Sequence, residues 1–330
     1  MKSLEGRRIL VTGADGFIGS HLVEALVRAQ ADVRAMVLYD PFERWGLIDW
    51  LPMSVRRTIE VVKGDVRSFS TVQQAVRGCQ IVFHLAALIS IPYSYVAPDA
   101  YIETNIRGTW HVLQACLEEG VERVIHTSTS EVYGTAQYVP MDETHPLRAQ
   151  SPYAATKIAA DKLAESYYYS FNLPVVILRP FNTFGPRQSA RAVIPTIITQ
   201  ALHSNIIKLG NLTPVRDFTF VDDVVAAFIR AAICDGVVGE VINIGTGSGV
   251  SVREIVDYVA QIVGRELHVQ SIQERSRPAT SEVERLICDA QKAQRLLGWL
   301  PRCKFVDGLK VTVQWIAEHI EFYKPHIYAI

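Results

Sequence analysis

Short apolar runs rich in β-branched residues alternate, over the first 180 residues, with longer segments whose apolar residues recur every three or four positions. The first pattern predicts strands and the second predicts amphipathic helices. Strands are expected at Arg8–Thr12, Val33–Val37, Ile59–Val62, Ile81–Leu85, Val124–Thr127 and Val175–Arg179, and helices at Phe17–Ala29, Tyr101–Glu119 and Pro152–Asn172. Strands separated by helices join as parallel βαβ units. We therefore predict an α/β fold built on a doubly wound parallel sheet with helices on both faces.

The order of elements becomes less regular after Pro180. Helices are expected at Val193–His203, Asp222–Ala232, Val252–Val263 and Phe305–Lys324, and short extended pieces at Ile207–Leu209 and Asp217–Val221. The run Val241–Ile244 has the composition of a strand that could return to the main sheet. We predict a first domain over residues 1–180, with residues 217–245 partly returning to it, and a smaller, partly interleaved C-terminal α/β lobe over residues 181–330.

Charge and composition narrow the possible partners. The chain has 330 residues and a net charge of −1, so nothing indicates binding to nucleic acid or to an anionic membrane. No apolar run approaches the ~18 residues of a membrane-spanning helix, and no apolar segment of a secretory signal precedes the first strand. The five cysteines are scattered without a C-x-x-C pair, so we expect reduced thiols and no metal site. These features predict a cytoplasmic protein.

A glycine-rich turn lies between the first predicted strand and the first predicted helix, with the sequence GADGFIG over residues 13–19. Glycines permit a tight turn, a close approach of the backbone to a pyrophosphate, and close packing of helix on strand. The N-terminus of the helix offers free N–H groups to phosphates. The context of strand, turn and helix predicts a dinucleotide site. Its expected contacts are Gly13, Asp15, Gly16, Phe17, Ile18 and Gly19.

The G-x-x-G-x-x-G spacing of this turn resembles that of the extended short-chain dehydrogenase/reductase family, which has a Rossmann-type sheet. Further matching positions cover nearly the whole chain. The resemblance implies NAD or NADP as a tightly bound cofactor that is recycled in each turnover, with Asp65 facing the adenine and Asn105 bracing the central helix. The cofactor contacts that it implies beyond the turn are Asp65, Val66, Leu85, Ala86, Ala87, Asn105, Thr127, Ser128, Tyr153 and Lys157.

The choice between NAD and NADP stays open at the level of sequence. Enzymes that use NAD usually carry an acidic residue at the end of the second strand, where it binds the ribose 2′-hydroxyl. The tip of that strand is expected at Val37, which is not acidic, and Asp40 lies a little farther along the chain.

Tyr153 and Lys157 are four residues apart in a predicted helix, so both side chains lie on one face and can converge on one ligand. In the family, this pair oxidises a sugar hydroxyl. A tyrosine has a pKa of about 10 in water, and we expect Lys157 and the oxidised nicotinamide to lower that pKa together. Tyr153 would then take the proton of the sugar C4 hydroxyl. Ser128 or Thr129 would hydrogen-bond that hydroxyl.

The segment after Thr129 separates the possible reactions. An epimerase that only turns over a 4-keto sugar needs no further acid or base, whereas the sequence places Ser130 and Glu131 here. Oxidation at C4 makes the C5 proton acidic, so Glu131 is the candidate base for elimination of the C6 hydroxyl. Dehydratases of dTDP-glucose mostly carry an aspartate where this chain has Ser130, and serine is too weak an acid to protonate the leaving hydroxyl alone. A serine–glutamate pair is also found in UDP-glucuronate decarboxylases.

Four longer segments, at residues 91–95, 129–139, 187–195 and 277–283, resemble LegB-type 4,6-dehydratases. That resemblance implies dehydration of a nucleotide-activated N-acetylhexosamine, UDP-GlcNAc, in the biosynthesis of deoxyamino sugars of the legionaminic type. Alternatives are a UDP-glucuronate decarboxylase, a nucleotide-sugar 4-epimerase and a non-catalytic cofactor-binding protein. Residues expected to bind the substrate are Ser90, Asn182, Arg187, Arg191, Leu209, Arg216 and Arg277.

We also predict a homodimer, because in this family the helices predicted at Tyr101–Glu119 and Pro152–Asn172 pair with their copies as a four-helix bundle. Apolar residues expected on the paired faces are Leu113, Ala159, Ala160, Leu163 and Tyr167.

Overall fold

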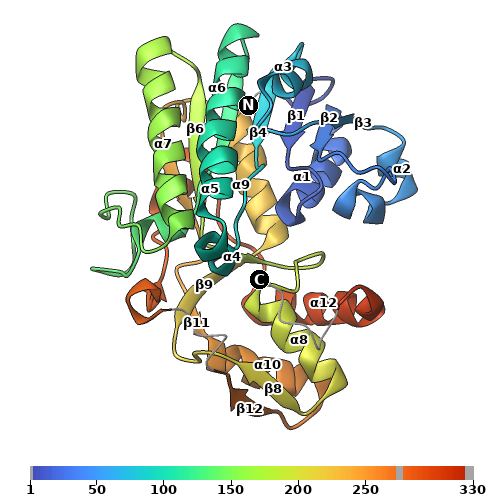
Figure 1. Ribbon diagram of the computed structural model, residues 1–330, viewed down its shortest axis with the longest axis vertical. Helices are drawn as coiled ribbons and strands as arrows, with labels where there is room; N and C mark the ends of the chain where they lie inside the picture. The colour runs from blue at the N-terminus through green and yellow to red at the C-terminus, as the bar shows by residue number, and fades with distance from the viewer. Residues whose placement is uncertain (1–2, 273–277, 324–330) are drawn as a thin grey trace.

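A computed structural model describes residues 3–272 and 278–323 and has a seven-stranded parallel sheet at the centre of its larger lobe (Figure 1). The strand order is β10-β6-β5-β4-β1-β2-β3. β1 therefore lies between β2 and β4, and the chain winds outward from it in both directions, which confirms the doubly wound sheet. The strands are β1 (Arg8–Thr12), β2 (Asp32–Val37), β3 (Glu60–Lys63), β4 (Ile81–His84), β5 (Arg123–Thr127), β6 (Val175–Pro180) and β10 (Val241–Ile244).

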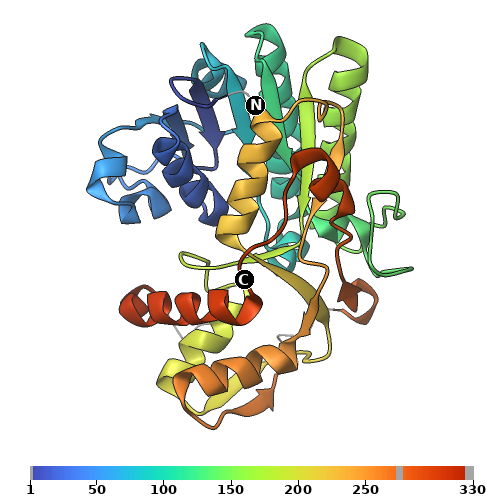
Figure 2. The same cartoon turned by 180° about the vertical axis from the view of Figure 1, so that it is seen from behind.

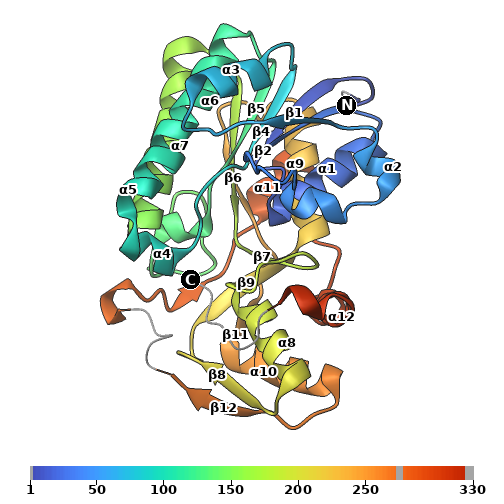
Figure 3. The ribbon, with the colours of Figure 1, turned by 45° about the vertical axis from the view of Figure 1, so that its right-hand side comes forward.

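Helices cover both faces of this sheet (Figure 3). α3, α6 and α7 pack together on one face, and α1, α9 and α11 pack on the other. The strands between them carry nearly unbroken apolar runs, as expected for a sheet buried on both sides. The helices of the larger lobe are α1 (Phe17–Arg28), α2 (Met53–Arg56), α3 (Phe69–Val76), α4 (Ile91–Val96), α5 (Pro98–Tyr101), α6 (Gly108–Glu118), α7 (Pro152–Phe171), α9 (Val221–Ile233) and α11 (Gln291–Leu297), with short turns η1 (Gly46–Trp50) and η3 (Ser130–Tyr133).

The smaller lobe lies against the carboxyl ends of the main strands (Figure 2). One sheet has the order β11-β9-β13, with β7 also paired to β9, and β12 pairs with β8. Its elements are β7 (Asn182–Phe184), α8 (Val193–His203), β8 (Ile206–Leu209), β9 (Val215–Phe220), β11 (Gly249–Ser251), α10 (Val252–Val263), β12 (His268–Ser271), η5 (Ala279–Ser281), β13 (Arg285–Leu286), α12 (Phe305–Glu318) and η6 (Ile320–Phe322).

The two lobes share one apolar core. A single buried cluster includes Val11 of β1, Phe220 of β9 and Ile316 of α12. β10 lies beside β6 in the larger sheet, with Ile242 opposite Leu178, although β8 and β9 precede it in the chain. The boundary at residue 180 stays a prediction, since the chain crosses between the lobes more than once.

The structure corrects two predicted helices. The segment predicted as one helix over Tyr101–Glu119 consists of α5, a π-helical stretch η2 (Ile102–Arg107) and α6, because apolar periodicity does not distinguish a π turn from an α-helical one. The helix predicted over Phe305–Lys324 ends at Glu318, and the short turn η6 follows it. Lys324 itself lies outside the described residues.

The predicted dimer face also needs correction. Leu113, Ala160 and Tyr167 are buried inside the protomer, whereas Ala159 and Leu163 are half-buried. The exposed large apolar side chains of η2, α6 and α7 are instead Ile102, Trp110, Tyr169 and Phe171.

No helix among the described residues is both long and apolar enough to cross a membrane. The same residues contain no group of three His, Cys, Asp or Glu side chains placed to hold a metal ion.

Candidate active site

One cavity of about 1530 Å³ lies where the carboxyl ends of β1, β4, β5 and β6 meet the smaller lobe. This is the position expected for a ligand in an open α/β sheet, at the point where the strand order reverses. Its wall contains every predicted site residue that the structure describes except Asn105 and Ser130. Arg277 lies outside the described residues.

The glycine turn forms the end of the cavity nearest to β1. A Cβ atom at Gly13 would lie 2.8 Å from the Cα of Ala86, and one at Gly19 would lie 2.1 Å from the carbonyl oxygen of Gly13. α1 begins after Gly16 with no side-chain cap and no acidic residue in its first turn. The N–H groups at this helix N-terminus are therefore available to an anion, and the turn fits the pyrophosphate of a dinucleotide.

Asp65 and Val66 line the cavity on the side of β3. Arg67 Nη2 lies 2.6 Å from Asp65 Oδ2, and the hydrogen bond from Arg67 holds the pKa of Asp65 below its ordinary value. Val66 packs closely on the start of α6, because a Cβ at Gly108 would lie 2.8 Å from its side chain.

Asn105 lies in the π-helical stretch and makes no contact with the cavity. Its side chain accepts a hydrogen bond from the N–H of Leu88 at 2.8 Å and donates to Thr156 Oγ1 at 3.1 Å. Asn105 therefore links a cavity-lining segment to α7. The expectation that it braces the central helices fits these contacts, whereas direct contact with a cofactor does not.

The first turn of α7 carries Tyr153, because Ser151 caps the helix by accepting a hydrogen bond from the N–H of Ala154 at 3.1 Å and Pro152 occupies the first turn. Burial raises the pKa of Tyr153, a hydrogen bond with Thr129 lowers it, and the Glu131 carboxylate raises it further. Together, burial and these neighbouring groups raise the pKa of Tyr153. The spacing of Tyr153 and Lys157 in the sequence predicts a lowered pKa instead.

Lys157 is buried and its ammonium donates to the carbonyl oxygen of Thr127 at 2.6 Å. Burial lowers the pKa of Lys157 to about 8, and the charge of Asp161 acts in the opposite direction. The pKa of Lys157 is therefore close to neutral pH, where a group can act efficiently as a general acid or base.

Asp161, which the sequence reasoning missed, is a fully buried carboxylate beneath this pair. It accepts hydrogen bonds from Ser128 Oγ at 2.8 Å and from Arg179 Nη2 at 3.0 Å, and lies 3.3 Å from His126 Nε2. Although burial opposes ionisation, His126, Arg179 and Lys157 keep the pKa of Asp161 below its ordinary value. The spacing of four residues from Lys157 was the available signal for this residue.

These contacts separate the two candidates for binding the sugar hydroxyl. Ser128 donates its hydroxyl proton to Asp161, whereas Thr129 hydrogen-bonds with Tyr153. Thr129 Oγ1 also accepts from the N–H of Glu131 at 3.2 Å, so it holds the start of η3. Thr129 is therefore better placed than Ser128 to act beside Tyr153.

Glu131 and Ser130 differ in their access to the cavity. Glu131 is half-buried and lines the wall, and its charge acts on Tyr153. Ser130 is buried and does not line the cavity. The expectation that Ser130 positions or protonates a substrate hydroxyl is therefore not supported by its location, because the turn of η3 places Glu131 rather than Ser130 at the wall.

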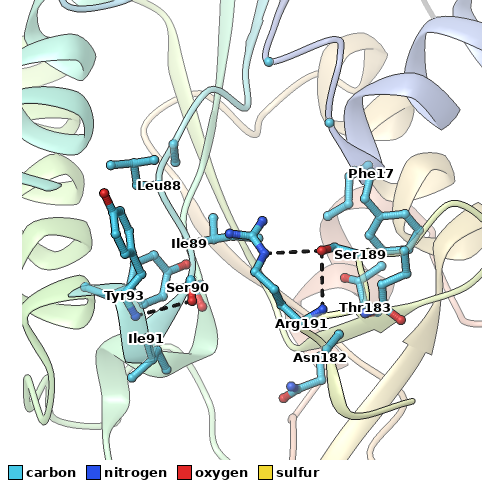
Figure 4. A pocket seen from close by; sticks show the side chains of 18 of the residues that line it. Phe17, Leu88, Ile89, Ser90, Ile91, Tyr93, Asn182, Thr183, Ser189 and Arg191 are labelled. Carbon is cyan, nitrogen blue, oxygen red and sulfur yellow. Dashed lines mark hydrogen bonds between the residues drawn. The ribbon is translucent and has the colours of Figure 1, made fainter. Parts of the chain in front are cut away.

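Two segments face each other across the part of the cavity shown in Figure 4. Ser90 and Tyr93 lie on one side, and Ser189 and Asn182 lie on the other. Arg191 extends from the second side toward the first, with its Nε 3.2 Å from Ser189 Oγ. Ser90 also caps α4 by accepting from the N–H of Tyr93.

Two other arginines predicted to bind the substrate are each close to a carboxylate of the protein. Arg187 is buried and its guanidinium donates to Glu24 at 2.9 Å and to His21 at 3.2 Å. This commits Arg187 to α1, although part of it lines the cavity. Arg216 lies 3.6 Å from Glu282 and also lines the cavity with Leu209.

Comparison with known proteins agrees with this geometry. The GDP-mannose 4,6 dehydratase family matches residues 10–312. The low-salt glycan biosynthesis protein of Haloferax volcanii is 33% identical over 313 residues, which cover 93% of this chain and 97% of that protein.

Two solved structures have the same fold, each with a TM-score of 0.87. UDP-glucuronic acid 4-epimerase from Bacillus cereus, solved with UDP-glucuronic acid and NAD, is 29% identical and covers 94% of this chain and 99% of its own. The dTDP-glucose 4,6-dehydratase of Streptomyces venezuelae, solved with NAD, is 30% identical and covers 96% of this chain and 99% of its own. The chain therefore belongs to the GDP-mannose 4,6 dehydratase family of extended short-chain dehydrogenases/reductases.

Proposed function

We propose that this protein is a nucleotide-sugar 4,6-dehydratase that converts a nucleotide-activated N-acetylhexosamine, UDP-GlcNAc, to its 4-keto-6-deoxy product. The observation that carries this proposal is the carboxylate of Glu131 at the cavity wall, close enough to Tyr153 to raise its pKa. Removal and return of hydride at C4 alone would not need this carboxylate, whereas elimination across C5 and C6 needs a base.

The cofactor proposed for this cavity is NAD or NADP, held at its pyrophosphate by the glycine turn and by the N-terminus of α1. When bound, the cofactor would supply the hydride chemistry of the reaction, removal of hydride from C4 of the sugar and its return to C6. Lys157 and Tyr153 line the same cavity as Thr127. Both side chains are therefore available to the sugar carbon that reacts.

Two residues of the protein carry out separate proton transfers in this proposal. Tyr153 takes the proton of the C4 hydroxyl, and Thr129 supports the phenolate because its hydrogen bond lowers the pKa of Tyr153. Glu131 then removes the C5 proton, which the adjacent ketone has made acidic. The electron pair forms the C5–C6 double bond as the C6 hydroxyl leaves.

The leaving hydroxyl needs a proton to depart as water. Four carboxylates of described residues line the cavity. Asp15 and Asp65 lie at the end with the glycine turn, and Glu282 faces Arg216. Glu131, which has just taken the C5 proton, is therefore the proposed donor, and it takes the role that an aspartate at position 130 has in other dehydratases. When hydride returns to C6, Glu131 takes up a proton from solvent and delivers it to C5, and Tyr153 releases the C4-hydroxyl proton to solvent, so that both groups return to their starting state.

The substrate class is proposed from the resemblance to LegB-type enzymes, with Arg191 and Arg216 as the candidate partners of the diphosphate. The structural similarity to a UDP-glucuronic acid 4-epimerase favours a second candidate function, 4-epimerisation.

We also propose a homodimer, in which the exposed side of α6 and α7 pairs with its copy.

The test is incubation of purified protein with UDP-GlcNAc, followed by mass spectrometry of the sugar nucleotide. Loss of one water supports dehydration, whereas a product of unchanged mass with a new retention time indicates epimerisation. UDP-glucuronate, tested in parallel, would lose carbon dioxide if the protein were a decarboxylase.

Two matched variants then separate the chemical steps. Glu131→Gln keeps Tyr153 and Lys157, so it should oxidise C4 and accumulate absorbance near ~340 nm while elimination slows by roughly 10²- to 10⁴-fold. Tyr153→Phe should abolish both steps. Full dehydratase turnover by Glu131→Gln would show that Glu131 is not the base.

A further inference from the structure

The end of β2 lacks an acidic side chain of its own. The strand ends at Val37, and Leu38 and Tyr39, which follow it, are exposed. Asp40 is engaged by Arg44, with Nη2 2.7 Å from Oδ2, and is not among the cavity-lining residues that the structure describes. The acid that usually binds the adenosine ribose in NAD enzymes is therefore not supplied by β2. If a carboxylate binds this ribose, it comes from another segment.

Asp15 brings a carboxylate to this position from the neighbouring glycine turn. The N–H of Leu38 donates to Asp15 Oδ2 at 3.3 Å, so the carboxylate lies at the tip of β2 although it does not belong to that strand. The turn is tied to β2 by the N–H of Ala14, which donates to the carbonyl of Met36 at 3.2 Å. Asp15 also lines the cavity.

The backbone around Asp15 is built to hold it there. The N–H of Leu47 donates to the carbonyl oxygen of Asp15 at 3.1 Å. Gly46 has a φ of +58°, and a Cβ at Gly46 would lie 2.9 Å from the Cβ of Asp15. A larger residue at position 46 would therefore displace Asp15.

The charges near Asp15 favour a hydroxyl over a phosphate. Burial raises the pKa of Asp15 and the N–H of Leu38 lowers it, so a further hydrogen-bond donor would stabilise the carboxylate. Arg67 is the cavity-lining cation that follows β3, the strand paired with β2, and its Nε and Nη2 both contact Asp65, at 3.0 and 2.6 Å. A 2′-phosphate would meet the Asp15 carboxylate and an arginine that is already paired.

We propose that Asp15 accepts a hydrogen bond from the ribose 2′-hydroxyl of the adenosine and repels a 2′-phosphate, so that the protein selects NAD over NADP. The inference rests on the family's dinucleotide cofactor and not on the proposed sugar substrate. Because its test measures binding, its failure is distinguishable from failure of the proposed dehydration.

The experiment equilibrates purified protein with an equimolar mixture of NAD⁺ and NADP⁺, removes free dinucleotide, and quantifies what heat denaturation releases by mass spectrometry. A hydrogen bond to a charged group corresponds to roughly 10- to 100-fold in affinity. The wild type should therefore release NAD in at least ~10-fold excess, and Asp15→Asn should reduce the ratio of NAD to NADP by ~10-fold or more.

Asp40→Asn is the matched control, because it removes the competing acidic residue just beyond β2 and should leave the ratio unchanged. Asp15→Ser, which keeps a short acceptor for the N–H of Leu38, provides the same comparison if Asp15→Asn does not fold. The proposal is overturned if the wild type releases mainly NADP, if the folded Asp15 variant keeps the wild-type ratio, or if Asp40→Asn changes the ratio as much as the Asp15 variant.

Discussion

We expect Lys157 to destabilise the folded protein at neutral pH, because its ammonium is buried. Replacement by methionine keeps the length of the side chain and removes the charge. The difference in the free energy of unfolding between the wild type and Lys157→Met should depend on pH, because the lysine loses its proton more readily in the folded protein. Lys162→Met on the same helix is the control, since Lys162 is exposed and paired with Glu165 at 2.7 Å.

The size of the effect follows from the pKa of Lys157, which burial lowers from 10.5 to about 8. At about 1.36 kcal/mol for each unit of pH, burial of the charge costs about 3 kcal/mol at pH 7. The unfolded chain binds more protons than the folded protein between the two pKa values, so the free energy of unfolding rises with pH in that window. The wild type should gain about 2 kcal/mol relative to Lys157→Met between about pH 7 and about pH 9.5.

Urea unfolding without added dinucleotide, followed by fluorescence of the five tryptophans, measures this difference at the two pH values. Comparison between variants cancels the titration of tyrosines and cysteines, which both proteins share. A stability difference that stays within about 0.5 kcal/mol across this range, or an equal pH dependence in Lys162→Met, would refute the depressed pKa of Lys157.

Three further results are expected. Gly19→Ala should abolish dinucleotide binding in calorimetry, because the added Cβ would lie 2.1 Å from the carbonyl oxygen of Gly13. Gly16→Ala should weaken binding less, because its Cβ would lie 3.2 Å from the same oxygen. Equal binding by both variants would contradict this. Thr129→Val removes a hydrogen bond that lowers the pKa of Tyr153, so the rising limb of kcat/KM should move to higher pH, and an unmoved limb would argue against that role. Light scattering should show a dimer at micromolar concentration and a shift toward monomer for Trp110→Glu, whereas a monomeric wild type would exclude the proposed dimer.

Local spacing in the sequence determined the elements that carry the site. The strand, glycine turn and helix from Arg8 to Arg28 were predictable because a glycine pattern between two periodic segments specifies a turn whatever surrounds it. The approach of Tyr153 and Lys157 to one cavity followed in the same way, since four residues in a helix return to the same face.

Tertiary structure decided which of these residues meet one another and with what electrostatic consequence. Asp161 contacts Arg179 of β6 and Ser128 after β5, contacts that no spacing along the chain specifies. The pKa of Tyr153 rises because packing buries it beside Glu131, and a pKa depends on desolvation and on charges that only the folded chain assembles.

The same reason explains where the local interpretation failed. Ser130 and Glu131 are neighbours in sequence, but the turn of η3 places only Glu131 at the cavity wall. The end of β2 has no acidic residue in sequence, yet the fold sets the carboxylate of Asp15 beside Leu38. The sequence by itself determined the parallel sheet, the glycine turn and the helix with its reactive pair, because each depends on neighbours a few residues apart. The access, charge state and partners of the reactive groups were decided only by tertiary structure, because they depend on burial and on contacts between distant segments.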